Sequence, residues 1–181
     1  VIEMDALPPT PLVPEGITIR PFIRGQEEHA MVAAEQDAFR EHWGFVERPL
    51  EEEVEEWMHW LETDPSVDPA LWFIAVDGKE IAGMAICFPK LAEDPEMAYV
   101  DTLGVRRPWR KRGLGLALLQ HAFGACYERG KRKVALDVDA ESLTGATRLY
   151  ERAGMHVQRQ EVAYEKELRP GKDLSTQSVA E

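Results

Sequence analysis

Apolar residues recur along this chain at two spacings, which predict strands and helices in turn. Strand-like patterns cover residues 17–22, 71–76, 80–88, 97–105, 134–138, 157–159 and 162–168. Helix-like patterns, with apolar residues three or four positions apart, cover residues 26–39, 49–61, 114–127 and 144–154. The predicted order is β-α-α-β-β-β-α-β-α-β-β. We therefore expect a mixed α/β (α+β-like) domain, in which four helices flank a sheet of about seven strands.

Turn residues mark the boundaries between these elements. Asp77 and Gly78 separate two strand patterns and predict a hairpin. Pro49 starts the second helix, and Gly130 lies where the third should end. Thr144 is expected to cap the fourth helix.

The two ends of the chain differ from its middle. Residues 1–15 are rich in proline and predict a linker or N-terminal arm, and residues 169–181 are polar and predict a flexible tail. One domain over residues 16–168 remains between them. Because the chain begins with Val1 and a proline-rich stretch, we expect it to be a piece of a longer protein.

Composition narrows the classes of function. The 181 residues carry a formal net charge of −12, which disfavours nucleic acid as a partner. The sequence has no apolar run long enough to span a membrane and no signal-peptide pattern, so we expect a cytoplasmic protein that does not bind membranes. Neither the two cysteines nor the five histidines have the spacing of metal ligands, so we expect no metal site.

A basic, glycine-containing turn stands out against this acidic background. Residues 110–115 read Arg-Lys-Arg-Gly-Leu-Gly and lie between a strand pattern and a helix pattern. The free N–H groups and the positive dipole end of a helix N-terminus bind anions, and glycines let a ligand approach the backbone. The turn therefore predicts a phosphate or pyrophosphate site. The alternative is a tight strand-to-helix turn on the surface that binds no ligand.

The spacing of the turn distinguishes between known anion sites. It lacks the Lys-Ser/Thr of a P-loop, and Leu118 replaces the third glycine of the dinucleotide fingerprint. The remaining pattern, Arg-x-x-Gly-x-Gly after a strand, resembles the acyl-CoA-binding motif of the GNAT N-acetyltransferase superfamily. Residues 103–108 and 148–155 also match that family in order and spacing. The resemblance covers residues 16–168 and implies the GNAT fold, with a mixed, mostly antiparallel sheet.

The resemblance implies acetyl-CoA as co-substrate and assigns residues to it. In this family the strand before the turn splays from its neighbour, so the backbone of Leu103 and Val105 is expected to pair with pantetheine. The pyrophosphate is expected on the amides of residues 112–116. Ser142 lies where the family often has asparagine, and it has a shorter reach. The full set expected to bind the cofactor is Leu103, Val105, Arg110, Lys111, Arg112, Gly113, Leu114, Gly115, Leu116 and Ser142.

Transfer of an acetyl group to an amine needs an acid, an oxyanion donor and a base. By resemblance, Tyr150 is the candidate acid that protonates the departing thiolate, and the Val105 N–H is the candidate oxyanion donor. Tyr150 packed on the sheet is the alternative. For the base, Asp101 is the first candidate, and it could instead be a solvent-facing acid or a buried, hydrogen-bonding aspartate beside Thr102. Glu41 and His42 are further candidates.

These features predict an N-acetyltransferase that moves the acetyl group of acetyl-CoA to a primary amine of a small molecule by direct attack in a ternary complex. Cys87 and Cys126 are expected to be packed thiols, since direct transfer needs no acyl-enzyme. The alternative is a non-catalytic acyl-CoA-binding module that acts as a sensor or as half of a larger protein. The organisation resembles the C-terminal half of tandem, mycothiol-synthase-like GNAT proteins, so a homodimer or a second GNAT domain is expected as partner.

Overall fold

A computed structural model describes residues 1–91, 93–139, 145–162, 164, 166, 168 and 174–176. The described strands are β1 (Ile2–Glu3), β2 (Ile17–Pro21), β3 (Trp72–Asp77), β4 (Glu80–Phe88), β5 (Met97–Val105) and β6 (Lys133–Ala135). The described α-helices are α1 (Glu28–Phe39), α2 (Leu50–Thr63), α3 (Leu114–Glu128) and α4 (Ala146–Arg152). Two short 3-10 helices, Pro69–Leu71 and Arg107–Trp109, precede β3 and follow β5.

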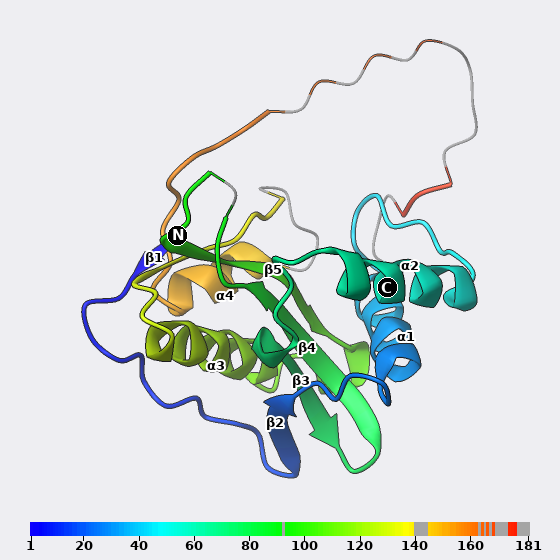
Figure 1. Ribbon diagram of the computed structural model, residues 1–181, viewed down its shortest axis with the longest axis horizontal. Helices are drawn as coiled ribbons and strands as arrows, with labels where there is room; N and C mark the ends of the chain where they lie inside the picture. The colour runs from blue at the N-terminus through cyan, green and yellow to red at the C-terminus, as the bar shows by residue number, and fades with distance from the viewer. Residues whose placement is uncertain are drawn as a thin grey trace.

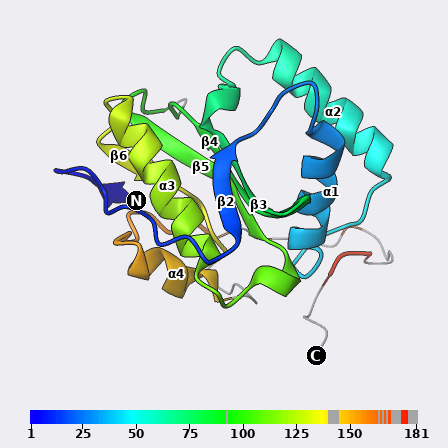
Figure 2. The same cartoon turned by 90° about the horizontal axis from the view of Figure 1, so that it is seen from below.

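The strands form one mixed sheet in the order β1-β6-β5-β4-β3-β2. Each described pair of neighbours is antiparallel except β5 and β6, which run parallel. Helices α1 and α2 lie on one face of the sheet, and α3 and α4 lie on the other (Figures 1 and 2). This confirms the expected mixed α/β fold with a mostly antiparallel sheet.

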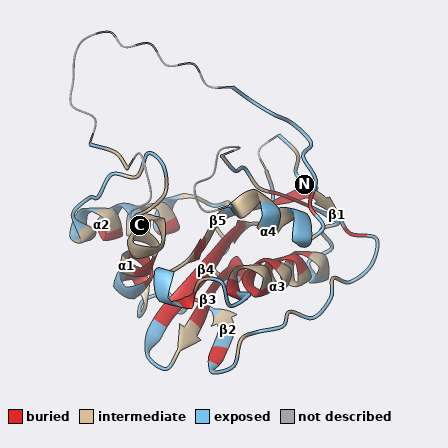
Figure 3. Ribbon diagram, turned by 180° about the vertical axis from the view of Figure 1, so that it is seen from behind, coloured by how far each residue is buried: buried red, intermediate tan, exposed pale blue. Residues whose placement is uncertain are grey.

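Two apolar clusters, one on each face of the sheet, form the core. The cluster under α3 includes Phe123 and Leu118, together with Ala98 and Val100 of β5. The cluster under α1 and α2 is built around Trp72. Buried positions follow the central strands and the inner side of α3 (Figure 3).

The chain ends differ from the sequence prediction. The prediction of a strand over residues 157–159 is wrong, because these residues are exposed and lie outside the sheet. The described members of the predicted strand 162–168 are not in a strand either, and its other members lie outside the described residues. Instead, β1 in the predicted N-terminal arm pairs with β6, with Ile2 opposite Val134. Strand β1 thus lies at the edge of β6, and the described sheet has six strands where about seven were predicted.

Two further boundaries shift. The strand predicted over residues 134–138 is the three-residue β6, and the capping role predicted for Thr144 lies outside the described residues. In the predicted tail, Thr176 is bonded to the loop between α1 and α2. Its N–H donates to the Phe45 carbonyl (2.9 Å), and its carbonyl accepts from the Gly44 N–H (2.8 Å).

Close packing of β4 on β5 gives a test of the fold. A Cβ added at Gly83 would lie 2.6 Å from the Gly104 carbonyl oxygen, a backbone atom that cannot turn away. Gly83→Ala should therefore lower the free energy of unfolding by about 2 kcal/mol or more. Gly124→Ala in α3 is the matched control: nothing lies within 4 Å of the new Cβ, and the change should stabilise by up to about 1 kcal/mol. Urea unfolding of both variants measures the difference.

Candidate functional site

Strands β5 and β6, which run parallel, separate after the third residue of β5. Their pairing joins Met97 to Lys133, Ala98 to Val134 and Tyr99 to Ala135. Strand β5 continues for six residues beyond Tyr99, and no described residue pairs with it on that side. The Tyr99 hydroxyl donates to Asp137 (3.2 Å) at the point of separation. The fold thus leaves an open strand edge.

Backbone groups in the second half of β5 point to that open edge at every second residue. The Arg106 N–H donates to the Ala82 carbonyl of β4 (3.0 Å). Because backbone groups alternate sides along a strand, the N–H groups of Leu103 and Val105 point away from β4. The Val105 carbonyl accepts from Arg110 Nε (2.9 Å). The open edge therefore offers both groups of Leu103 and the N–H of Val105.

A bulge lies between the paired and the open halves of β5. Ile86 of β4 is opposite Thr102 and Cys87 is opposite Val100, so Asp101 has no residue opposite it. Bulges re-aim side chains and are frequent beside active sites. Val100 and Leu103 both contact the cluster under α3. Asp101 is exposed, and its charge acts both on Glu35 of α1 and on Cys87 of β4.

The turn after β5 has the backbone of an anion cradle. Gly113 precedes α3 with a φ of 85°, and Lys111 has a φ of 61°, which is uncommon for a residue with a Cβ. Left-handed residues within such a turn make successive N–H groups converge. The N–H groups of Leu114, Gly115 and Leu116 have no acceptor among the described residues. They lie in the first turn of a 15-residue helix, at the positive end of its dipole.

Close packing favours glycine at position 115. A Cβ there would lie 3.3 Å from Leu149 Cδ2 of α4 and 3.6 Å from Val105 Cγ2. The absence of a side chain lets α3 start directly beside both β5 and α4. The cradle and the open edge are thus held next to one another.

Three arginines at or just before the turn, Arg106, Arg107 and Arg110, are ion-paired with acidic residues of the fold. Arg110 donates to the carbonyls of Val105 and Ala38 (both 2.9 Å) and is ion-paired with Glu41, whose side chain is only 15% exposed. Arg107 also pairs with Glu41 (3.0 Å), and Arg106 pairs with Asp37 (2.7 Å). Glu41 therefore holds the turn to α1. The sequence pattern did not reveal this role, because the partners are far apart in the chain.

This clamp can be tested on stability. Arg110→Met removes three bonds and leaves Glu41 with one partner, so the free energy of unfolding should fall by about 1–3 kcal/mol. Arg112→Met is the matched control, because Arg112 is exposed and has no ion pair among the described residues. It should change stability by less than about 0.5 kcal/mol. Equal losses in thermal or denaturant unfolding would contradict the clamp.

Tyr150 lies on α4 and packs against the cluster under α3. Burial raises the pKa of its hydroxyl above the ordinary tyrosine value, so the phenol stays protonated at neutral pH. Within the described part of the chain the hydroxyl has no hydrogen-bond partner. The Tyr150 side chain is packed against the core, as its structural interpretation predicts, and its hydroxyl is protonated, as the role of acid requires.

The structure adds a carboxyl group that sequence reasoning missed. Glu35 on α1 is half-buried, and burial, reinforced by the charges of Glu53 and Asp101, raises its pKa to about 7. The available signal was its position four residues after the buried Met31, on the same helix face. Of the other candidate bases, Glu41 is engaged in the clamp, and His42 Nδ1 lies 2.9 Å from the Trp43 carbonyl oxygen.

The two cysteines, Cys87 and Cys126, are buried. Burial raises the pKa of both thiols, that of Cys126 to about 11. No group of three or more metal-binding side chains occurs among the described residues. None of the described helices is long and apolar enough to cross a membrane. Ser142 lies outside the described residues.

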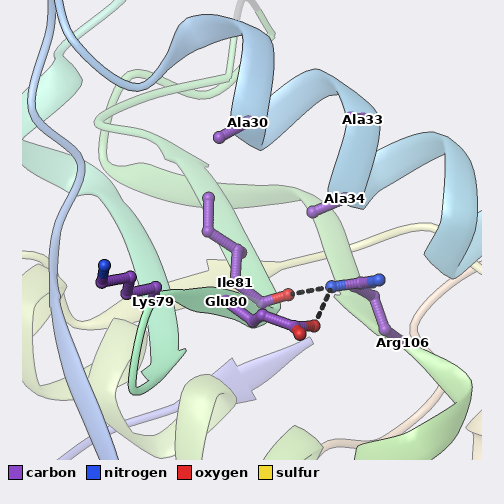
Figure 4. Close-up of a pocket in the computed structure, with 7 residues that line it drawn as sticks. All are labelled: Ala30, Ala33, Ala34, Lys79, Glu80, Ile81 and Arg106. Carbon is purple, nitrogen blue, oxygen red and sulfur yellow. Dashed lines mark hydrogen bonds and ion pairs between the residues drawn. The ribbon is translucent and has the colours of Figure 1, made fainter.

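A pocket of about 220 Å³ lies between α1 and β4, beside Arg106 (Figure 4). Arg106 Nη1 donates to the Ile81 carbonyl (3.0 Å) and to Glu80 (3.3 Å) across its floor. None of the described residues that were predicted to bind the cofactor or to catalyse lines this pocket. The pocket is therefore separate from the open edge and the cradle.

Comparison with known proteins agrees with this geometry. The sequence profile of the acetyltransferase (GNAT) family matches residues 28–155. A mycothiol acetyltransferase of Streptomyces scabiei is 31% identical over 166 residues, which cover 90% of this chain and 50% of that protein. The chain thus spans about half the length of the curated relatives it matches.

Solved structures show the same fold. A GCN5-related N-acetyltransferase from Sphaerobacter thermophilus has a TM-score of 0.72 and 43% identity, over 87% of this chain and 46% of that one. The aminoglycoside N-acetyltransferase AAC(6')-Iy, solved in complex with CoA, has a TM-score of 0.62 and 18% identity, over 86% of this chain and 99% of that one. The splayed strand pair, the cradle and the matched profile lead to one assignment: this chain belongs to the acetyltransferase (GNAT) family.

Proposed function

We propose that this chain transfers the acetyl group of acetyl-CoA to a primary amine of a small molecule, by direct attack in a ternary complex. The observation that carries the proposal is the open edge of β5 leading into the cradle at the start of α3. Pantetheine would pair with the backbone of Leu103 and Val105. Its pyrophosphate would be bound by the amides of residues 112–116, which include three without an acceptor in the described residues.

The residues around the edge suit the chemistry of thioester aminolysis. The Val105 N–H, directed to the open edge, would stabilise the oxyanion. Tyr150, protonated at neutral pH, would donate to the departing sulfur. Asp101 at the bulge is the carboxylate that the sequence predicts as the base for the amine. Lys111 and Arg112 are exposed and would add positive charge near the phosphates.

Two further observations support a small cationic acceptor. Several relatives are named mycothiol acetyltransferases, and the formal net charge of −12 favours cations by long-range attraction. A second GNAT domain or a second copy of the chain is proposed as partner, because the matched relatives are about twice as long.

The test is an acceptor screen on the purified chain. Acetyl-CoA is incubated with glucosamine, spermidine or sisomicin, and thiol release and acetylated amine are both measured. We expect at least one amine to give equal amounts of the two products. Acetyl-CoA binding without any acetylated amine would instead favour the non-catalytic module.

A further inference from the structure

We infer that Glu35 takes the proton from the acceptor amine in the transfer reaction, a role for which the sequence pointed to Asp101. The inference rests on the proposed function and assigns its base. Glu35 is a half-buried acid of α1 that has no role in the proposed function as stated so far.

The position of Glu35 follows from the packing of α1 on β5. Glu35 lies four residues before Phe39, so the two side chains share one helix face. Phe39 Cε2 and Ala38 Cβ lie 3.0 and 3.1 Å from where a Cβ of Gly104 would be. This part of α1 therefore lies directly against the half of β5 that has the open edge.

The charges around Glu35 favour a cation. The titratable groups that act on it are Glu53 from α2 and Asp101 from β5, and both are acidic. Neighbouring polar groups of α1 have partners: Asp37 pairs with Arg106, and Gln36 donates to Glu53. Glu35 has no hydrogen bond or ion pair within the described residues. An ammonium group entering between α1, α2 and β5 would supply the missing positive charge.

The protonation equilibrium of Glu35 suits a base at neutral pH. Its pKa of about 7 is set first by burial and then by Glu53 and Asp101. A base whose pKa lies near the working pH is ionised often enough to act and basic enough to accept a proton. Asp101 is exposed and accepts from the Thr102 hydroxyl (2.9 Å), so it remains a charge that attracts the amine.

The protons and bonds of the reaction balance when Glu35 acts as the base and Tyr150 as the acid. The ammonium gives one proton to the Glu35 carboxylate, and the freed lone pair forms the C–N bond as the carbonyl π pair moves to oxygen. Collapse restores C=O and breaks C–S, and sulfur takes a proton from Tyr150. The phenolate regains the second proton lost by nitrogen, and Glu35 releases the first to solvent. The products are an amide, a free thiol and one proton.

The pH dependence of kcat tests this assignment, with one amine and saturating acetyl-CoA for all variants. In the wild-type chain, kcat should rise with pH through a limb near 7, because Glu35 must be ionised. Glu35→Gln should lose the limb and at least about 100-fold in kcat, with the Kd for acetyl-CoA unchanged. Glu53→Gln removes a neighbouring negative charge, so it should move the limb to lower pH.

The results distinguish failure of the Glu35 assignment from failure of the proposed function. A limb that survives Glu35→Gln, or one that is lost in Asp101→Asn and only moved in Glu35→Gln, would overturn the inference while leaving the proposed function intact. Absence of acetylated amine with the wild-type chain, under conditions where calorimetry shows acetyl-CoA bound, would overturn the proposed function and the inference with it.

Discussion

Gly113→Glu should abolish the binding of acetyl-CoA to this chain. The substitution puts a carboxylate at the start of α3, where the phosphates are expected on the first-turn amides. Two like charges about 4 Å apart near a protein surface repel by about 4 kcal/mol, which is about a thousandfold in Kd. Isothermal titration calorimetry with acetyl-CoA measures the loss.

Gly130→Glu is the matched control for that experiment. Gly130 has a φ of 83°, close to the 85° of Gly113, and neither has an atom within 4 Å of the new Cβ. Both variants therefore carry the same left-handed strain, but Gly130 lies at the other end of α3. Acetyl-CoA should bind Gly130→Glu as it binds the wild-type chain. Tight binding to folded Gly113→Glu would show that the phosphates dock elsewhere.

Tyr150→Phe should lower kcat by about 10²- to 10⁴-fold while leaving the Kd for acetyl-CoA unchanged. The variant keeps the ring that packs under α4 and removes only the hydroxyl that would protonate the thiolate. Because burial raises the pKa of this phenol, the acid form persists as pH rises through the ordinary tyrosine range. The alkaline fall of kcat should therefore begin above about pH 10 in the wild-type chain.

Tyr127→Phe serves as the control for loss of a tyrosine hydroxyl. Tyr127 lies on α3, with the Arg132 guanidinium 3.7 Å above its ring, and it has no role in the proposed transfer. Its kcat should match that of the wild-type chain. Amine-dependent thiol release at the full rate in Tyr150→Phe would remove Tyr150 from the mechanism.

The centre of the fold could be predicted from sequence because its signals are local. The β5 pattern, the glycine turn and the apolar stripe of α3 follow one another in the chain, and the structure places β5 at Met97–Val105 as predicted. The chain ends could not be predicted in the same way. An alternating pattern such as residues 157–159 favours a strand but does not specify a partner, and β1 occupies the edge of β6.

The features of the site also differ in whether local sequence predicts them. The cradle and Tyr150 belong to motifs that can be seen in contiguous sequence. The Glu41–Arg110 clamp and the raised pKa of Glu35 depend on side chains from separate elements that meet only in the folded chain. Sequence spacing carries no information on such contacts.

Transfer of a labelled acetyl group tests the central claim most directly. The chain is incubated with acetyl-CoA deuterated in its acetyl group and with the most active amine of the screen, and amine and protein are both analysed by mass spectrometry. Direct attack predicts the label in an amide of the amine, in proportion to thiol released, and none on the protein. Label retained on the protein, or an unlabelled amine despite bound acetyl-CoA, would contradict direct acetyl transfer by this chain.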